Sequence, residues 1–281
     1  MTSSSGQGDG LGAQTIVVDV ADELARRVVS GNYAPGDLLP SVRQVADEFD
    51  MNRATAQLVL ARLESYGFAE ARRGKGFVIR DVRREGGVGV FRRLFHLSGD
   101  APDPAFDMFR DVVAVEKSIV LDTLLAYTGS EHRVDQAELR AVIDELETLA
   151  RRPDPDHRAI LTVEIDLVRR LLTALGHGMR RAVLNSIGEM VLEVPAAVDA
   201  YYAADPDLHV LVWQALLAVW ESETGPSTAQ LALFEDLFEL YHVKVLARFE
   251  ESLAPATGTA AVLRTARRGA VGNTADLAWV R

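Results

Sequence analysis

The sequence predicts a mainly α-helical protein with two domains: three helices plus a β-hairpin at the N-terminal end, then an antiparallel bundle of six or seven helices. Three observations support this. Two short amphipathic segments within residues 36–65 are followed directly by a basic hairpin. Apolar residues recur at helical spacing over residues 91–253, with breaks at prolines and glycines. A chain of 281 residues is long enough for two ordinary domains.

The helices of the first domain each have a local signal. Apolar residues at helical spacing predict helices over 17–29, 42–49 and 53–66. Ser41 and Asn52 stand before the second and third helices, and both are good N-cap residues.

The hairpin and the first loop are predicted from glycine and proline. Strands over 68–72 and 77–80 flank the tip 73–76, whose sequence is Arg-Gly-Lys-Gly. The segment 32–40 holds two prolines and a glycine, so we expect it to be a turn.

Charge is distributed unevenly along the chain. The net charge of −11 argues against a protein that coats nucleic acid nonspecifically, so any DNA contact must come from a local basic patch. Residues 52–80 are such a patch, since two glutamates, Glu64 and Glu70, face six cations: Arg53, Arg62, Arg72, Arg73, Lys75 and Arg80.

The order helix, turn, helix, hairpin predicts a winged helix-turn-helix that reads DNA. The second helix of the pair would enter the major groove, with Arg53 bonding guanine and Gln57 bonding adenine. Hydroxyl and amide side chains near helix starts suit phosphate oxygens, and glycines at the hairpin tip permit close approach to the minor groove. The predicted DNA-contacting residues are Ser41, Arg43, Asn52, Arg53, Thr55, Gln57, Arg73, Gly74 and Lys75.

Residues 16–80 resemble the DNA-binding domain of GntR-family transcription regulators. The matching motifs are PGDLLPSVRQVADEF, NRATAQLVLARLESYGF and RRGKGFVI, and they cover about a quarter of the chain. The resemblance implies binding of a palindromic double-stranded DNA operator as a homodimer. It also implies DNA contacts at Arg43, Arg53, Thr55, Arg73 and Gly74. The family typically has arginine where this chain has Gln57, so we expect a different operator preference.

The second domain resembles that of the FadR-type branch, which holds a small effector inside a helical bundle. One sub-branch uses a divalent metal bound by an aspartate, a histidine four residues later and two further histidines. Neither Glu164 with Val168 nor Asp166 with Arg170 supplies the first pair. His209 and His242 fall where the later histidines are expected, but two histidines alone would hold a metal weakly. We therefore expect no metal and no cofactor.

The metal-free sub-branch, which binds acyl-CoA, fits better. The run LGHGMRRAVLNSIGEM and the segment 201–206 resemble its ligand-binding helices and helix junction. An apolar stripe could line a tunnel for an acyl chain, although it also suits an ordinary bundle core; it comprises Trp213, Leu216, Leu217, Trp220, Phe234, Leu237 and Phe238. Polar groups would bind the other end of the effector. The predicted ligand-binding residues are Arg169, Tyr201, Tyr202, Trp213, Tyr241 and Lys244.

Domain boundaries follow shifts in composition. Ser/Gly-rich and Ala/Thr/Gly/Arg-rich ends predict disordered tails, and a short Arg/Glu/Gly run predicts a linker. Pro195 is expected to kink a helix of the second domain. The predicted parts are a tail at 1–13, the DNA-binding domain at 14–81, a linker at 82–90, the helical domain at 91–253 and a tail at 254–281.

Several classes of protein are disfavoured. The absence of cysteine excludes disulfides and thiolate chemistry. No signal peptide is recognisable, and the longest apolar run, residues 208–220, is too short to cross a bilayer, so we expect a soluble cytoplasmic protein without membrane contact. A fused pyridoxal-phosphate aminotransferase domain would need alternating strands and far more chain, so we predict that the protein is not an enzyme. A helical dimerisation domain without a small ligand stays open.

Overall fold

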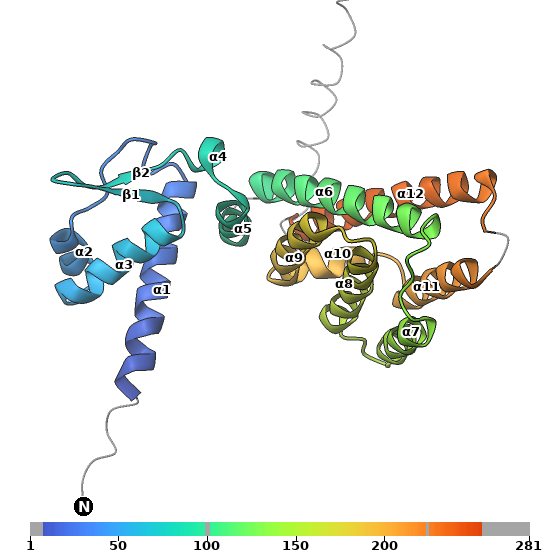
Figure 1. The fold of residues 1–281 in the computed structure, drawn as a ribbon. Helices are drawn as coiled ribbons and strands as arrows, with labels where there is room; N and C mark the ends of the chain where they lie inside the picture. The colour runs from blue at the N-terminus through green and yellow to red at the C-terminus, as the bar shows by residue number, and fades with distance from the viewer. Residues whose placement is uncertain (1–7, 99–101, 223–224, 255–281) are drawn as a thin grey trace, which may run out of the picture. The chain divides into compact units, whose positions relative to one another are not determined.

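The computed structural model describes residues 8–98, 102–222 and 225–254. These residues form twelve helices and a two-stranded sheet, which confirms the predicted mainly α fold (Figure 1). The chain divides into two compact units: the first combines the residues up to Met108 with Gly176–Val194, and the second combines Phe109–Leu175 with the residues from Pro195 onwards. None of the described helices is long and apolar enough to span a membrane.

Three helices open the first unit: α1 (Gly8–Val29), α2 (Val42–Glu48) and α3 (Arg53–Ser65). Both predicted N-caps are present. The Ser41 Oγ accepts from the Gln44 backbone N–H at 3.4 Å, while the Gln44 side chain accepts from the Ser41 N–H at 2.8 Å. The Asn52 side-chain oxygen accepts from the Thr55 N–H at 2.9 Å. These caps satisfy backbone donors that a helix start otherwise leaves unpaired.

The N-terminal helix starts earlier than predicted. It begins at Gly8, inside the expected tail 1–13, because a helix already nucleated by the apolar residues after Val17 extends at little further cost. Residues 255–281 of the predicted second tail lie outside the described residues.

The expected linker 82–90 is instead mostly helical. It contains α4 (Val82–Glu85) and the start of α5 (Val88–Leu97). Val82 and Val90 are buried in the core of the first unit, so the apolar residues of this Arg/Glu/Gly-rich run fold it against that core. The composition of this segment did not indicate its helices, because its exposed polar residues and glycines outnumber its buried apolar residues.

The predicted hairpin is present as β1 (Ala69–Arg72) and β2 (Gly76–Ile79), paired antiparallel from Ala69 opposite Ile79 to Arg72 opposite Gly76. The predicted turn at 32–40 differs in its second half, which pairs with β2. The Gly36 N–H donates to the Ile79 carbonyl at 2.9 Å, and the Leu39 N–H donates to the Phe77 carbonyl at 2.9 Å. This pairing satisfies an edge of β2 that would otherwise be open.

One apolar core holds the first unit together. Leu24 of α1 and Leu60, Leu63 and Phe68 of the α3–β1 region are fully buried in it. Helix α1 packs on α3 and α5, and α5 packs on α9 (Gly178–Leu192).

Two arginines of α5 reinforce these contacts. Arg92 pairs with Glu189 and Glu193 of α9, donating from Nε to Glu193 at 2.9 Å. Arg93 lies over the Tyr66 ring at 3.9 Å and pairs with Asp22 of α1 at 3.3 Å. Side chains of α5 therefore bind both α1 and α9.

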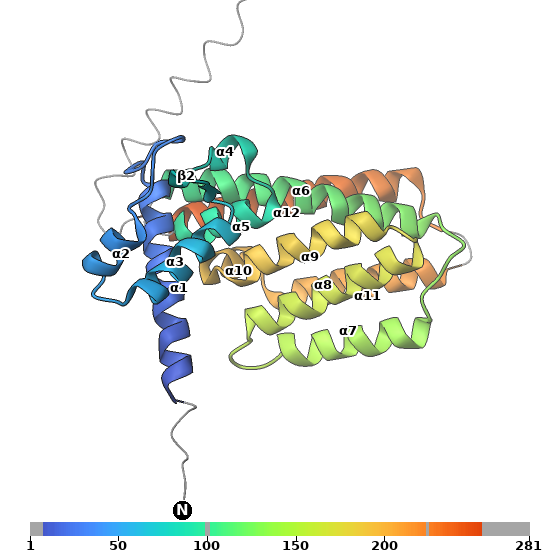
Figure 2. The same ribbon diagram turned by 60° about the vertical axis from the view of Figure 1, so that its left-hand side comes forward.

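The second unit contains most of α6 and five further helices. Helix α7 packs on α8 and α11, and α10 packs on α8 and α12; both views show α7 beside α11 and α6 beside α12 (Figures 1 and 2). Their bounds are α6 (Pro102–Thr128), α7 (Gln136–Ala150), α8 (His157–Ala174), α10 (Pro195–Tyr201), α11 (Pro206–Glu221) and α12 (Thr228–Ser252).

Pro195 does not kink a helix, contrary to the prediction. Helix α9 ends at Leu192 and α10 begins at Pro195. Proline fits a first helical turn because the N–H that it lacks would have no partner there.

Gly67 provides a test of the packing of the segment 82–90. Its φ is +82°, and an added Cβ would lie 2.7 Å from Cγ2 of Val90. Gly31 has a φ of +83° with nothing within 4 Å of an added Cβ. Gly31→Ala should therefore cost about 1 kcal/mol from backbone strain alone. Gly67→Ala should cost about 1–3 kcal/mol more from the clash, as measured by urea unfolding. Equal losses would mean that Val90 moves away freely.

Candidate functional site

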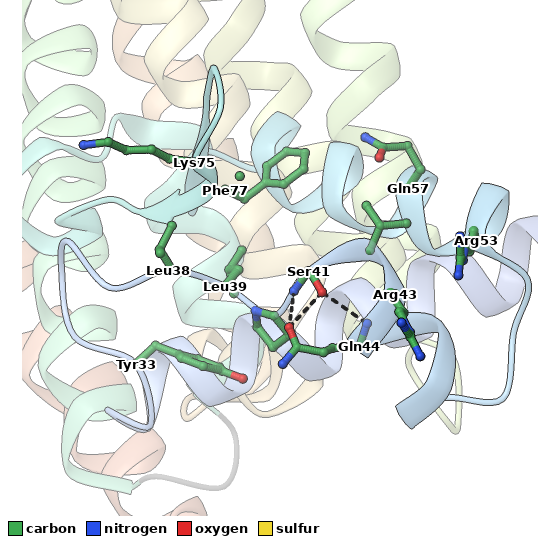
Figure 3. A pocket seen from close by; sticks show the side chains of 13 residues that line it. Tyr33, Leu38, Leu39, Ser41, Arg43, Gln44, Arg53, Gln57, Lys75 and Phe77 are labelled. Carbon is green, nitrogen blue, oxygen red and sulfur yellow. Dashed lines mark hydrogen bonds between the residues drawn. The ribbon is translucent and has the colours of Figure 1, made fainter.

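A hollow of about 980 Å³ lies between the loop before α2, the starts of α2 and α3, and β2. Thirteen residues line it, and Figure 3 shows Arg43 and Arg53 at one end and Lys75 at the other. Five predicted DNA-contacting residues line this hollow: Ser41, Arg43, Arg53, Gln57 and Lys75.

The start of α3 is exposed and rigidly built. Arg53 and Gln57 are exposed and four residues apart, so they lie on the same helical face. The Asn52 side-chain oxygen accepts from both the N–H and the hydroxyl of Thr55, at 2.9 and 3.1 Å. These bonds leave the Asn52 amide N–H groups as its donors to a phosphate. The Thr55 hydroxyl, half-buried, would have to exchange its bond to reach one.

Arg43 is readily available to a polyanion. It pairs with Asp47 at 3.7 Å, and both side chains are about three-quarters exposed. Exposed pairs of this kind contribute less than about 1 kcal/mol, so a phosphate can replace the aspartate.

The hairpin tip projects beside the hollow. Arg73, Gly74 and Lys75 are exposed, and Gly74 has a φ of +74°, which favours glycine. Only Lys75 of the three lines the hollow. The Glu64 carboxylate accepts from the Ala71 N–H at 2.7 Å and so ties the hairpin to α3. Sequence reasoning counted Glu64 only as a charge, because a contact seven residues apart has no local signal.

A largely buried carboxylate, with 14% of its side chain exposed, organises part of the second unit. Glu164 of α8 accepts from the Tyr202 hydroxyl at 2.7 Å and from the Trp213 indole N–H at 3.1 Å. The same carboxylate lies 3.0 Å from Nδ1 of His209 on α11. Its three partners leave this charge well satisfied despite its burial.

A second group surrounds Glu116 of α6. Its carboxylate lies 3.1 Å from Nε2 of His242 and accepts from the Tyr201 hydroxyl at 3.3 Å. Nδ1 of His242 lies 2.7 Å from the Phe238 carbonyl, which can only accept, so that nitrogen carries a proton.

Tyr241 joins these two groups. Its hydroxyl donates to the Tyr201 carbonyl at 2.8 Å, and its ring lies 5.3 Å from that of His209 and 4.8 Å from that of His242. Four predicted ligand-binding residues, Tyr201, Tyr202, Trp213 and Tyr241, therefore belong to one connected polar region. We call this region, together with Glu116, Glu164, His209 and His242, the polar cluster.

Burial and pairing act in opposite directions on the Glu164–His209 pair. Burial alone would raise the pKa of Glu164, but His209, Tyr202 and Trp213 hold that pKa below its usual value. Burial would lower the pKa of His209, but Glu164 raises it above its usual value. Burial, with Glu164 nearby, raises the pKa of Tyr202, so that hydroxyl stays a donor. The cluster thus holds an ion pair inside the unit.

One atom of the cluster is not satisfied. Nε2 of His209 is buried and has no hydrogen-bond partner among the described residues, although the nearby Tyr201 backbone helps to raise the pKa of this histidine. When His209 carries both ring protons in its ion pair with Glu164, this nitrogen is an N–H donor, and an acceptor atom of a ligand would remove the free-energy cost of leaving it without a partner.

Other predicted ligand residues differ in how far they are exposed. Lys244 is exposed on α12, and Arg169 is half-buried on α8. Leu237, predicted in the apolar stripe, is 56% exposed and does not fit a buried tunnel, whereas Trp213, Leu217 and Trp220 are buried.

Two cluster contacts were missed. Glu116 lies 126 residues from its partner His242, and the ring of His157 stacks on Tyr202 at 4.7 Å. Neither contact leaves a sequence motif.

The histidines do not form a metal site. Among residues 8–98, 102–222 and 225–254, no group of three or more histidine, aspartate or glutamate side chains is arranged to hold an ion. Both ring nitrogens of His242 and Nδ1 of His209 already have protein partners. The donor set therefore does not fit the metal-binding sub-branch.

Glu164→Gln tests the ion pair. Because the pKa of His209 is raised in the folded state, protonated His209 contributes fully to the free energy of unfolding below about pH 6.5, and this contribution is lost as the pH rises through the folded-state pKa. A lowered glutamate pKa stabilises it above about pH 4.5 and loses effect as pH falls through the folded pKa. We expect Glu164→Gln to lower the free energy of unfolding by about 3 kcal/mol, with the largest loss between about pH 4.5 and pH 6.5. The pKa of His209, measured by NMR, should also fall. A pH-independent loss with an unchanged His209 pKa would contradict this pairing.

Comparison with known proteins agrees with the DNA-binding prediction. Residues 16–79 match the family model described as bacterial regulatory proteins, gntR family. The transcriptional regulator Mce2R of Mycobacterium tuberculosis (strain CDC 1551 / Oshkosh) is 31% identical over 87 residues, which are 31% of this chain and 36% of that protein. That alignment thus covers about a third of the relative.

Two longer alignments reach the helical region. The putative L-lactate dehydrogenase operon regulatory protein of Escherichia coli (strain K12) is 26% identical over 67% of this chain and 78% of its own length. The fatty acid metabolism regulator protein of Yersinia pestis (strain Pestoides F) is 22% identical over 65% of this chain and 70% of its own length. Residues 16–79 therefore form a GntR-type winged helix-turn-helix, and the chain as a whole, with the helical region that follows, is similar to FadR-like transcription regulators of that family.

Proposed function

We propose that the protein is a ligand-responsive regulator that binds a palindromic operator as a homodimer and is released or modulated by a small acyl effector. The observation that carries the DNA-reading part is the exposed pair Arg53 and Gln57 on the first turns of a capped helix. Arg43 and Lys75 flank that pair around the same hollow.

Different side chains would read bases and bind phosphates. Arg53 has the geometry to bond O6 and N7 of guanine, and Gln57 to bond adenine one helical turn further on. Arg43 and Lys75 would neutralise phosphates and release counterions, so affinity would fall as salt rises. With a net charge of −11, binding would rely on this patch and not on the chain as a whole.

A homodimer is proposed because a palindromic site presents the same half-site twice. Two identical heads would then contact successive major grooves about 34 Å apart. An effector that favours one geometry of the helical region would change the spacing of the heads and thereby operator affinity.

The polar cluster is the proposed effector site. The unpartnered Nε2 of His209 offers a buried donor to a carbonyl or carboxylate oxygen, and Trp213, Leu217 and Trp220 offer apolar surface. The names of the two longer relatives concern fatty acid metabolism and an L-lactate dehydrogenase operon. A fatty acyl-CoA or a similar acyl ligand is therefore the proposed effector class, acting in the cytoplasm.

Metal-assisted carboxylate sensing is the less favoured alternative, because the two cluster histidines have their own carboxylate partners. A helical dimerisation domain without a small ligand is the other alternative, and ligand binding measurements separate it from the proposal.

Arg53→Ala tests base reading. We expect a loss of about 1–3 kcal/mol in operator affinity and relaxed specificity at a single base pair, measured by fluorescence anisotropy on a panel of substituted operators. Arg26→Ala is the matched control, since it removes an exposed arginine of α1 outside the hollow and should leave affinity unchanged. An equal loss on every sequence would mean that Arg53 contacts phosphate instead.

A thermal-shift panel tests the effector. A ligand at one hundred times its dissociation constant should stabilise the fold by about 2.7 kcal/mol and raise the Tm. We expect long-chain acyl-CoAs to raise the Tm of the wild type. At the same ligand concentration the rise should be much smaller in the His209→Ala variant. If acyl-CoAs, hydroxy acids and dicarboxylates all leave Tm unchanged while operator binding persists, the ligand-free alternative is favoured.

A further inference from the structure

Helix α12 exposes a row of large apolar side chains. Leu233, Leu237, Leu240 and Val243 are 59%, 56%, 52% and 54% exposed. A solvent-facing helix normally carries charged or polar side chains at such positions.

The spacing of this face is that of a coiled-coil seam. Six exposed residues follow one another at intervals of four, three, four, three and four: Ala229, Leu233, Asp236, Leu240, Val243 and Ala247. Alternating steps of four and three residues are the heptad spacing that keeps such a seam facing a partner helix. The alanines near both ends allow close approach of another backbone. We refer to these six residues as the α12 seam.

Two charged residues of α12 favour antiparallel over parallel packing of a second α12. Asp236 lies four residues before Leu240, and Lys244 lies four residues after it and beside the seam; both are exposed. Neither has a salt bridge to another residue in the described part of the chain. If a second α12 packs antiparallel with Leu240 on the two-fold axis, Asp236 faces the partner's Lys244 and the reverse pair forms as well. A parallel pairing would instead oppose two aspartates.

The apolar residues match in the same register. Leu237 then lies opposite the partner's Val243, and Leu233 lies opposite the partner's Ala247. A large residue thus meets a smaller one on each side of the axis. A two-fold contact requires a face complementary to itself, and this face meets that requirement in both shape and charge.

We propose that the α12 seam is the two-fold interface of the homodimer, with the two α12 helices antiparallel about Leu240. This inference rests on the homodimer of the proposed function and names the face that forms it. A second exposed apolar face, formed by Leu208, Leu211 and Val212 of α11, has no comparable charge complement, since α11 contains aspartate and glutamate but no lysine or arginine.

A charge-swap series tests both face and direction. Asp236→Lys and Lys244→Asp each place like charges together at two symmetric sites, so each should raise the dimer dissociation constant at least about tenfold in sedimentation equilibrium. The double variant D236K/K244D restores opposite charges and should return the constant to within about threefold of wild type. A salt bridge between the two exchanged residues of the same helix cannot explain such a recovery, because eight residues separate them by about 12 Å along the helix.

An apolar pair of variants gives an independent measurement. Leu240→Glu should yield monomers that keep wild-type helix content by circular dichroism. These monomers should bind an isolated half-site normally but lose the preference for the palindrome. Leu211→Glu on α11 is the control, since Leu211 is similarly exposed (56% against 52% for Leu240) and its substitution should leave the dimer intact.

The outcomes separate the inference from the function on which it rests. A dimer unaffected by both Leu240→Glu and the charge swaps overturns the α12 interface but leaves the homodimer standing. Dissociation by Leu211→Glu alone would place the interface on α11. A wild-type protein that stays monomeric with and without a palindromic operator would overturn the homodimer itself.

Discussion

The proposed DNA-reading surface depends on the burial of one face of α3. Ala56, Val59, Leu60 and Leu63 lie in the core between α1, α2 and the hairpin, and this burial sets the rotation of the helix. Arg53 and Gln57 on the other face must then point outward. The core thereby supplies the precision that base recognition needs, while the reading side chains contribute little to folding.

Polar groups inside the second unit follow a different logic. The largely buried Glu164 has three hydrogen-bonding partners, Tyr202 just after α10 and His209 and Trp213 of α11, which offset the cost of removing its charge from water. Such a group gives little net stability compared with an apolar core, but it can specify one arrangement of side chains. In the proposed effector site, Tyr202, His209 and Trp213 surround one carboxylate, so an acceptor atom of a bound ligand would change the whole hydrogen-bond network.

The exposed seam of α12 contrasts with both of these regions. Its apolar side chains gain nothing in a monomer, since water surrounds them. In the proposed dimer a second helix buries the same side chains, and this burial stabilises the pair. Asp236 and Lys244 then favour the antiparallel direction. In this proposal, residues of the two units account for DNA reading, effector binding and dimerisation.

The sequence by itself determined the mainly α fold, the two N-caps and the hairpin, because each depends on residues a few positions apart whose spacing carries the signal. Tertiary structure alone decided the pairing of segment 36–39 with β2, the folding of 82–90 onto the core and the start of α10 at Pro195. It also brought Glu116 to His242 across 126 residues and exposed Leu237 and Lys244. Helical periodicity says that a face is apolar, but only packing between distant elements decides whether that face is covered.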